Sequence, residues 1–331
     1  MHSPVALSGF AYHLPATSRA LHQLAESGLL TGSVATLEAF GFANARIATD
    51  ESHVEMAVRA ARRTLDETGT DPGDVGLVLY AGALASSSVA PCTPPPPGSL
   101  LHLESVRELF RYPASILQEQ LGLDGAVVAG VNQQACASMF TAIQFGRASL
   151  IADPNLDTVL CVASDRLPDG VARDIVFNVV SDGACAVMLR RDAPMNRVLA
   201  IHHVTKPMLF EGGAGDVDGG ADAEVVAAYF PTAVRVIEDT VRNAGLSLDD
   251  IEWVIPHNVS LRSWEILLGM LRMPMRKLFS ANIARVGHTI SADNLMNLRD
   301  AQDAGLLRRG DHLLLFTFGF GLNWSCMILE H

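Results

Sequence analysis

The chain has 331 residues, of which 49% are hydrophobic, and its 24 basic and 36 acidic residues give a formal net charge of −12. A chain of this size can bury one large core or two fused half-cores without disulfides or metals to stabilise them. The net negative charge argues against broad binding to nucleic-acid phosphates, which requires a positive field. The apolar runs are too short to cross a bilayer, and the first residues do not resemble a secretion signal. We therefore expect a cytoplasmic protein whose partners are neither nucleic acid nor membrane.

The cysteines lack the paired spacing of a disulfide framework or of a CxxC site. There are five of them: Cys92, Cys136, Cys161, Cys185 and Cys326. The histidines form no HExxH pattern either. The sequence therefore predicts no metal site and no bound cofactor, and each cysteine has to be judged by its own surroundings.

One local pattern occurs twice along the chain. Apolar residues recur at helical spacing over residues 54–65, and a turn and a strand-like run at 75–82 follow. Later, a helical stretch from about residue 228 leads through a turn to the strand-like run 251–256. The pattern predicts the same helix–turn–strand unit in each half of the chain.

A second pair of segments also corresponds. Residues 134–165 and residues 286–319 each begin with small residues, continue as a helix and a turn, and end in a buried strand. In this register Cys136 matches His288, so both are expected where a helix begins. The chain is therefore predicted to be an internally duplicated α/β protein.

We place the two halves at residues 1–190 and 191–331, with an insertion in the first at about 81–115. The offset between matching positions is larger before this segment than after it, which locates the extra residues. Four consecutive prolines, Pro94–Pro97, exclude regular helix or central strand there and favour a stiff extended excursion. Both a plain surface loop and a lid over a functional site fit this composition.

Cys136 is the strongest candidate for chemistry. It follows the strand-like run 126–131 and precedes an amphipathic helix. Unpaired backbone N–H groups and the positive end of a helix dipole at such a position stabilise a thiolate. A lone cysteine is more often inert core, and we assign Cys161 and Cys185, which lie within strand patterns, to the core.

Two histidines are expected near this cysteine. His257 follows Pro256 at the carboxyl end of a predicted strand, where open α/β sheets place reactive groups. His288 follows Gly287 at the beginning of another predicted helix, where a neutral imidazole can donate a hydrogen bond to a developing oxyanion. A strand-end histidine can also be merely structural.

Several segments together resemble the thiolase superfamily, and within it the type III ketoacyl-acyl-carrier-protein synthases. The similar motifs are QQACASMF around Cys136, PHNVSLR beginning at Pro256, GHTIS beginning at Gly287, VSDGACAVML, and the final FGFGLNWSCMILEH. The resemblance covers nearly the whole chain. It implies a thiolase-like fold of two duplicated βαβαβαββ halves that form an αβαβα layered sandwich.

The resemblance also implies roles for these residues. The family's nucleophile falls on Cys136 and its first catalytic histidine on His257, whereas its catalytic asparagine falls on His288. Asp293 is an alternative for this third role, because some ester-forming relatives use an aspartate, although its spacing from His288 places it on a different helix face. The oxyanion hole falls on the N–H groups of Cys136 and Phe320, and Phe320 replaces a glycine of the family.

The implied substrates are acyl thioesters of coenzyme A or of acyl carrier protein, and the implied activity is acyl transfer to a small-molecule acceptor. Arg262 matches a family position associated with the carrier protein or with the phosphopantetheine phosphate, although a solvated charged helix face explains it equally well. Family members usually form homodimers through the central sheet.

The departures at His288 and Phe320 favour a specialised acyltransferase of secondary metabolism that resembles the polyketide-related members. The alternatives are a decarboxylative Claisen condensing enzyme with a Cys-His-His site and a catalytically silent partner subunit of a heteromeric synthase. A thioesterase-like hydrolase is a further alternative.

Overall fold

The first half of the chain supplies five strands of one large mixed sheet. The structure is a computed structural model that describes residues 4–84, 110–175, 178–207, 220–320 and 322–331. The five strands are β1 (Val5–His13), β4 (Leu77–Ala81), β5 (Val127–Val131), β6 (Thr158–Asp165) and β9 (Gly183–Arg191). Between them run the helices α3 (His53–Thr68), α4 (Pro113–Leu121) and α5 (Ser138–Ala152). β4 pairs in parallel with β5 and β6, whereas β9 is antiparallel to β6 and β1, so the order is β5-β4-β6-β9-β1.

The second half has the same strand order as the first, but the counterpart of β5 is reduced to a single bridge. Its strands are β10 (Arg197–Thr205), β11 (Ile251–Pro256), β12 (His312–Gly319) and β13 (Asn323–Glu330). Its helices are α6 (Gly220–Asn243), α7 (Leu261–Met270), α8 (Ala281–Val286) and α9 (Asp293–Asp303). The strand order is β11-β12-β13-β10, and the counterpart of β5 is reduced to a parallel bridge between Val254 and Leu278. The predicted duplication is therefore present in the topology, but the second half falls one full strand short of βαβαβαββ.

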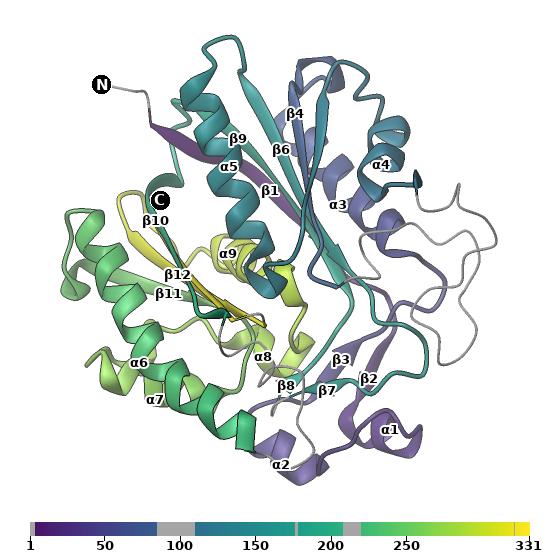
Figure 1. Cartoon of the computed structure of the whole chain (residues 1–331), viewed down its shortest axis with the longest axis vertical. Helices are drawn as coiled ribbons and strands as arrows, with labels where there is room; N and C mark the ends of the chain where they lie inside the picture. Colours follow the sequence, from purple (N-terminus) through teal and green to yellow (C-terminus); the bar gives the residue numbers. More distant parts are fainter. Residues whose placement is uncertain (1–3, 85–109, 176–177, 208–219, 321) are drawn as a thin grey trace.

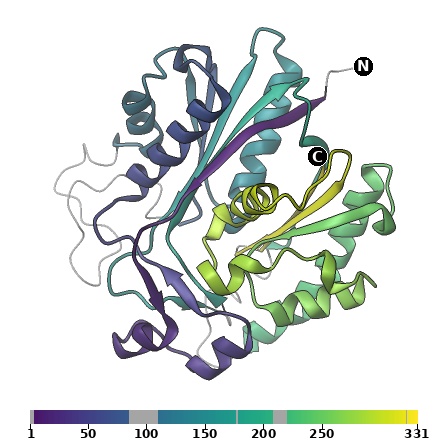
Figure 2. The same ribbon diagram turned by 180° about the vertical axis from the view of Figure 1, so that it is seen from behind.

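Helices and sheet halves alternate in five layers (Figure 1). α3 and α4 cover the outer face of the first half-sheet, and α6 and α7 cover the outer face of the second. α5 and α9 lie between the two half-sheets and share one core with both of them. Seen from behind, the yellow-green α9 lies between the purple β1 and the yellow strands of the second half (Figure 2). The half-sheets join at one antiparallel pair, Ala6 with Arg197.

Smaller elements gather at the end of the sheet where the parallel strands finish (Figure 1). They are α1 (Leu21–Glu26), α2 (Val34–Ala39), β2 (Ser18–Ala20), β3 (Asn44–Arg46), β7 (Asp174–Ile175) and β8 (Asn178–Val179). Short 3-10 turns complete the chain: η1 (Pro72–Asp74), η4 (Ala135–Ala137), η7 (Leu248–Asp250), η8 (Met275–Lys277) and η9 (Ile290–Ala292). Two of these turns lie at the candidate site: η4 contains Cys136, and η9 lies between His288 and Asp293.

The sequence patterns located the repeated helix–turn–strand units well. α3 contains the predicted helix at 54–65, and Ser52 begins it as a capping residue whose side chain accepts a hydrogen bond from the Glu55 N–H group. β11 coincides with the predicted strand at 251–256. α6 begins at Gly220, earlier than the predicted helix, because the apolar spacing that was used does not mark its first turns.

Part of the predicted insertion lies outside the described residues. These are residues 85–109, which include Cys92 and the prolines Pro94–Pro97. The choice between a surface loop and a lid therefore stays a prediction. In the parts of the chain that the structure describes, no helix has the length and apolarity to cross a bilayer, and no three His, Cys, Asp or Glu side chains are arranged to hold a metal ion.

A buried ion pair between Arg173 and Asp182 fixes the segment that joins β6 to β9. The guanidinium of Arg173 donates to both carboxylate oxygens of Asp182, at 2.7 Å and 3.1 Å, and their side chains are 3% and 0% exposed. The carboxylate also accepts hydrogen bonds from the N–H groups of Ala48 and Leu167. Removing one partner of such a pair leaves the other charge buried without compensation, which is costly.

We expect Arg173→Met to lower the free energy of unfolding by about 3–5 kcal/mol, because the carboxylate of Asp182 then lacks its cation in the interior. Urea denaturation of the variant and the wild type measures the difference. Arg235→Met is the control, because the Arg235 side chain is exposed and lies 4.0 Å from the Asp239 carboxylate, which is a long distance for an ion pair. This variant should leave the free energy of unfolding unchanged within error. Equal stability of Arg173→Met and the wild type would contradict the assigned role of the buried pair.

Candidate active site

Cys136 lies in the turn η4 directly before α5, as the sequence predicted. The backbone reaches it through two non-glycine residues with positive φ, Gln133 at 70° and Ala135 at 44°. Such conformations cost about 1–3 kcal/mol each and are concentrated at functional sites. The Cys136 side chain is buried, at 8% exposure. The strained turn therefore places one specific thiol at the beginning of a 15-residue helix.

His288 lies 152 residues after Cys136, but it is five residues before α9, whereas Cys136 is two residues before α5. The turn that corresponds to η4 is therefore η9, and the predicted match of Cys136 with His288 is displaced by three residues. Gly287 before His288 has a φ of 81°, a conformation that favours glycine. A Cβ atom on Gly287 would lie 2.8 Å from the carbonyl oxygen of Val179, so only glycine fits there. The His288 N–H group donates to this same oxygen at 2.8 Å. The duplicated backbone thus brings the cysteine of one half toward a histidine of the other.

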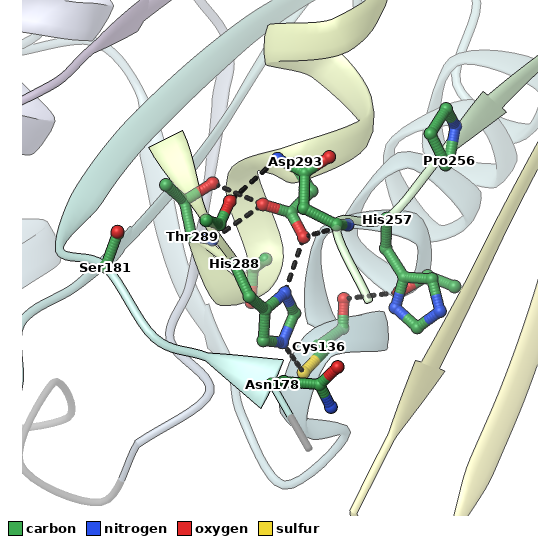
Figure 3. Close-up of polar contacts among 12 residues, drawn as sticks. Cys136, Asn178, Ser181, Pro256, His257, His288, Thr289 and Asp293 are labelled. Carbon is green, nitrogen blue, oxygen red and sulfur yellow. Dashed lines mark hydrogen bonds and ion pairs between the residues drawn. The ribbon is translucent and has the colours of Figure 1, made fainter. Parts of the chain in front are cut away.

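The two residues are joined to a third by hydrogen bonds (Figure 3). The Cys136 sulfur is 3.3 Å from Nε2 of His288, and Nδ1 of the same ring is 2.5 Å from Oδ2 of Asp293. The expectation that Asp293 lies on a different helix face from His288 is wrong, because His288 precedes the helix and Asp293 is its first residue. His288 and Asp293 are therefore consecutive members of one chain of contacts.

The carboxylate of Asp293 accepts four hydrogen bonds inside the protein. Its Oδ2 accepts from His288 and from the N–H group of Asn258 at 2.6 Å. Its Oδ1 accepts from the N–H group and the hydroxyl of Thr289, both at 2.6 Å. Burial alone would raise its pKa, but His288 and these donors lower it below the usual value. Asp293 is therefore held as an anion.

The pKa of His288 shifts in the opposite direction. Burial would lower it, but the Asp293 carboxylate and the Cys136 thiol outweigh burial and raise the pKa well above its usual value. A protonated His288 beside the Asp293 carboxylate is therefore the stable arrangement. This geometry places Nε2 of His288 3.3 Å from the Cys136 sulfur, where it can exchange a proton with the thiol.

His257 has a different environment. It follows β11 at Pro256, its side chain is fully buried, and neither ring nitrogen has a hydrogen-bond partner among the described residues. Its ring lies nearly perpendicular to that of His288, with the ring centres 5.9 Å apart. Burial, together with the nearby His288, lowers the pKa of His257 to about 3. His257 is therefore neutral and has one N–H group to offer a substrate.

The predicted oxyanion hole involves the segment after β12. A Cβ atom on Gly319 would lie 2.9 Å from the backbone nitrogen of Cys136, so this backbone packs directly against the nucleophile turn. Thr317 donates its hydroxyl to the carbonyl of Cys136 at 3.2 Å. Phe320 follows Gly319 immediately, whereas residue 321 is outside the described part. The oxyanion role of the Cys136 and Phe320 N–H groups stays a prediction.

The immediate surroundings of Cys136 are apolar. Its side chain packs with Leu167, Val180 and Ile290 in a small cluster separate from the three main cores. Ile290 has a φ of 58°, which is a rare conformation for a β-branched residue. Tyr229 of α6 is also close, since burial and the charge of Cys136 both raise its pKa. These side chains limit the access of water to the sulfur.

The other predicted residues lie outside this cluster. Arg262 is exposed on α7 and donates to Glu265 at 2.9 Å on the same helix, so its predicted role with a carrier or phosphopantetheine is not tested. Cys161 and Cys185 are fully buried, and burial raises the pKa of both thiols, in agreement with a place in the core.

Sequence patterns missed the residues that support the histidines, above all Asn258 and Asn297. In the sequence, Asn258 is part of the PHNVSLR motif and Asn297 lies within the helix predicted after His288. A signal was present: α9 buries Asn294 and Asn297 among Leu295, Met296 and Leu298. Buried amides on an otherwise apolar helix face require partners.

Comparison with known proteins gives a consistent picture. Residues 241–331 match the family model described as 3-Oxoacyl-[acyl-carrier-protein (ACP)] synthase III C terminal. The beta-ketoacyl-[acyl-carrier-protein] synthase III of Geobacillus kaustophilus is 31% identical over 309 residues, which cover 88% of this chain and 87% of the relative. The corresponding protein of Aquifex aeolicus is 27% identical over 297 residues, with 88% of both chains covered.

Solved structures share the fold over nearly the entire chain. The 3-oxoacyl-[acyl-carrier-protein] synthase III of Aquifex aeolicus superposes with a TM-score of 0.81 at 22% identity, and covers 99% of this chain and 100% of its own. ChlB3, described as an acyltransferase, gives a TM-score of 0.82 at 24% identity, with 99% and 97% covered. The similarity confirms the predicted thiolase-like fold.

We expect Asp293→Asn to lower the pKa of His288, because the imidazolium loses its anionic partner. Fewer Cys136 thiolates should then exist at neutral pH, and alkylation of Cys136 by iodoacetamide at pH 7 should slow by about tenfold or more. Peptide mass spectrometry measures the rate at this cysteine.

Glu265→Gln is the control for that experiment, since it removes a carboxylate from exposed α7 without touching the site. It should react like the wild type. If Asp293→Asn also kept the wild-type rate across the pH range, the carboxylate would have no influence on the cysteine.

Proposed function

The chain belongs to the beta-ketoacyl-[acyl-carrier-protein] synthase III family and is an acyltransferase, and from this premise we propose that it transfers an acyl group through a thioester bond at Cys136. The donor is an acyl thioester of coenzyme A or of acyl carrier protein, and the acceptor is a small molecule with a hydroxyl, amine or thiol group. The observation that carries the proposal is the hydrogen-bonded chain from Cys136 through His288 to Asp293.

In the first step the Cys136 proton is held by Nε2 of His288, and the thiolate attacks the carbonyl carbon of the donor. The N–H groups of Cys136 and Phe320 are the proposed donors to the tetrahedral oxyanion. As the carbon–sulfur bond of the donor breaks, the imidazolium of His288 returns the proton to the departing thiol. The product of this step is an acyl-enzyme at Cys136.

In the second step His288, now neutral, takes the proton of the acceptor, which attacks the acyl carbon. The bond from this carbon to the Cys136 sulfur then breaks, and the thiolate leaves beside the imidazolium of His288. Sequence reasoning gave this task to His257, but its pKa near 3 and the lack of a carboxylate partner make it the weaker base. His288 has Asp293 to stabilise the positive charge that forms, which is the arrangement of a nucleophile–histidine–carboxylate triad. His257 instead offers a neutral N–H donor to the substrate.

Decarboxylative condensation is the second candidate. That reaction generates its carbon nucleophile by loss of carbon dioxide, so it needs donors for the enolate oxygen but no base for the acceptor. The neutral, unpartnered His257 favours it, since one of its ring nitrogens can donate to such an oxygen. The Asp293 partner of His288 favours proton abstraction from a heteroatom acceptor. We therefore prefer acyl transfer to a heteroatom over decarboxylative condensation.

We propose a role in secondary metabolism of the polyketide kind, rather than in housekeeping fatty-acid synthesis. Two residues support this: His288 stands at the position of the family's catalytic asparagine, and Phe320 stands in its glycine-rich turn. A silent partner subunit is disfavoured by the complete Cys136–His288–Asp293 chain. A hydrolase would need water at a thiol that apolar side chains surround.

The test is mass spectrometry of the intact protein after incubation with acyl thioesters of coenzyme A and of a carrier protein. The wild type should gain one acyl mass, and Cys136→Ala should gain none, because the thioester forms at this sulfur. Cys161→Ala is the control, since that buried thiol should not contribute. If no thioester acylates the wild type, the proposed function is wrong.

The two candidate reactions are separated on the same acyl-enzyme. Addition of a malonyl thioester should release no carbon dioxide, whereas hydroxyl, amine or thiol acceptors should remove the acyl mass. Carbon dioxide release that depends on Cys136 would instead establish the condensing reaction.

We propose a homodimer that forms along β5, and carrier-protein docking near Arg262. Among the described residues, β5 pairs on one side only, with β4. The strand has no charged side chain, and Val127 on it is 67% exposed. An uncharged strand with one open edge is suited to pairing with an identical strand of a second chain.

We expect the wild type to be a dimer and a Val127→Lys, Ala129→Lys variant to be a monomer, because four lysines would face one another along the paired strands. Light scattering coupled to size-exclusion chromatography measures the mass. Glu119→Lys, on the neighbouring exposed face of α4, is the control and should stay dimeric. A monomeric wild type at micromolar concentration contradicts the proposal.

A further inference from the structure

A chain of buried asparagines lies behind the two histidines and takes no direct part in the chemistry. Its members are Asn258 after β11, Asn282 on α8 and Asn297 on α9, and all three side chains are buried. Their amide groups bond to one another and to the backbone on both sides of the catalytic residues. The bonds of each amide show what it holds in place.

Asn258 connects the two segments that carry the catalytic imidazoles. It is the residue after His257, and its backbone N–H donates to the Asp293 carboxylate at 2.6 Å. Its side-chain Nδ2 donates to the carbonyl of Gly287 at 2.8 Å, one residue before His288. The position of this one residue therefore affects both partners of the His288–Asp293 hydrogen bond.

Asn297 in turn fixes the position of Asn258. Its Nδ2 donates to Oδ1 of Asn258 at 2.8 Å and to the carbonyl of Pro256 at 2.7 Å. These two acceptors flank His257, whose own ring has no hydrogen bond to orient it in the described part of the chain. Both N–H donors of the Asn297 amide are thereby used, and a flipped amide would place its oxygen against two acceptors.

The orientation of Asn297 is secured from its other side. Its Oδ1 accepts from Nδ2 of Asn282 at 2.9 Å, and the same nitrogen donates to Asp300 at 2.8 Å. Asp300 also accepts from the hydroxyl of Tyr12 at 2.7 Å. Asp300 forms an ion pair with Arg285, which lies at the surface end of the network. The network thus runs from this ion pair to the carboxylate of Asp293.

We infer that Asn297 is a positioning residue, which sets the geometry of His257 and of the His288–Asp293 pair through Asn258 without contacting substrate. This inference rests on the role of His288 in the proposed function. A misplacement of about 1 Å at reacting groups costs on the order of 100-fold in rate, so an amide that holds both histidine segments has a large effect on turnover.

The test compares Asn297→Leu with Asn294→Leu. Both replace a buried amide of α9 by a side chain of similar size, but the contacts that Asn294 makes with described residues are to the carbonyls of Ile255 and Phe316 in the strands β11 and β12. Both variants should lose similar stability in urea. Only Asn297→Leu should lower the pKa of His288 in an NMR titration of labelled histidines, because the Asp293 contact loosens.

A second readout is the rate at which iodoacetamide alkylates Cys136. Asn297→Leu should react about tenfold more slowly than the wild type at pH 7 and regain reactivity as pH rises, whereas Asn294→Leu should keep the wild-type profile. If Asn297→Leu fails to fold, Asn297→Ser, which keeps a small polar group, is measured in the same way.

Neither readout requires an acyl donor, so the inference and the proposed function can fail separately. A wild type that no thioester acylates would end the proposed function, while a lowered His288 pKa in Asn297→Leu would still establish positioning. Identical titrations and alkylation rates for the two variants, or no change in either, would overturn the inference.

Discussion

The burial of the Asp293 carboxylate is the constraint on which the site depends. A charge in the interior is stable only if donors surround it, and Asp293 has four, supplied by residues 258, 288 and 289. These donors come from the end of β11 and from the turn before α9. The hydrogen bonds to this one carboxylate therefore hold the end of β11 against the turn before α9. Cys136, from the first half of the chain, contacts His288 at the same place.

Duplication places two similar turns beside each other. In both halves a 3-10 turn that begins at a residue with positive φ leads into a helix of the central layer: η4, from Ala135, before α5, and η9, from Ile290, before α9. The first turn contains Cys136. The second lies between His288 and Asp293. Because α5 and α9 lie together in the central layer, the two turns face each other.

Sequence periodicity was sufficient for the duplicated α/β pattern and for the place of Cys136 before a helix, whereas the layered thiolase-like fold came from the family resemblance. Helical and strand-like spacing fixes where regular elements begin and end, and Cys136 and His257 both lie at such boundaries. The His288–Asp293 contact escaped this reasoning because the chain between them is irregular, with Ile290 at a positive φ and the 3-10 turn η9. The contact between Asn258 and Asn297 spans 39 residues and two elements. Local spacing carries no information about such a distance.

The loss of a full strand in the second half has a consequence for solubility. At one edge of the described sheet, β5 pairs only with β4. At the opposite edge, Leu278 forms a bridge with Val254 of β11, and the Phe279 N–H group donates to the Val254 carbonyl. The two ends of the described sheet are therefore unlike. Within the described sheet, β5 is therefore the edge with no bridge to a further segment, whereas β11 has one. Repeated edge-to-edge addition of copies, the hazard of sheets with two open edges, is less favoured when the two edges differ in this way.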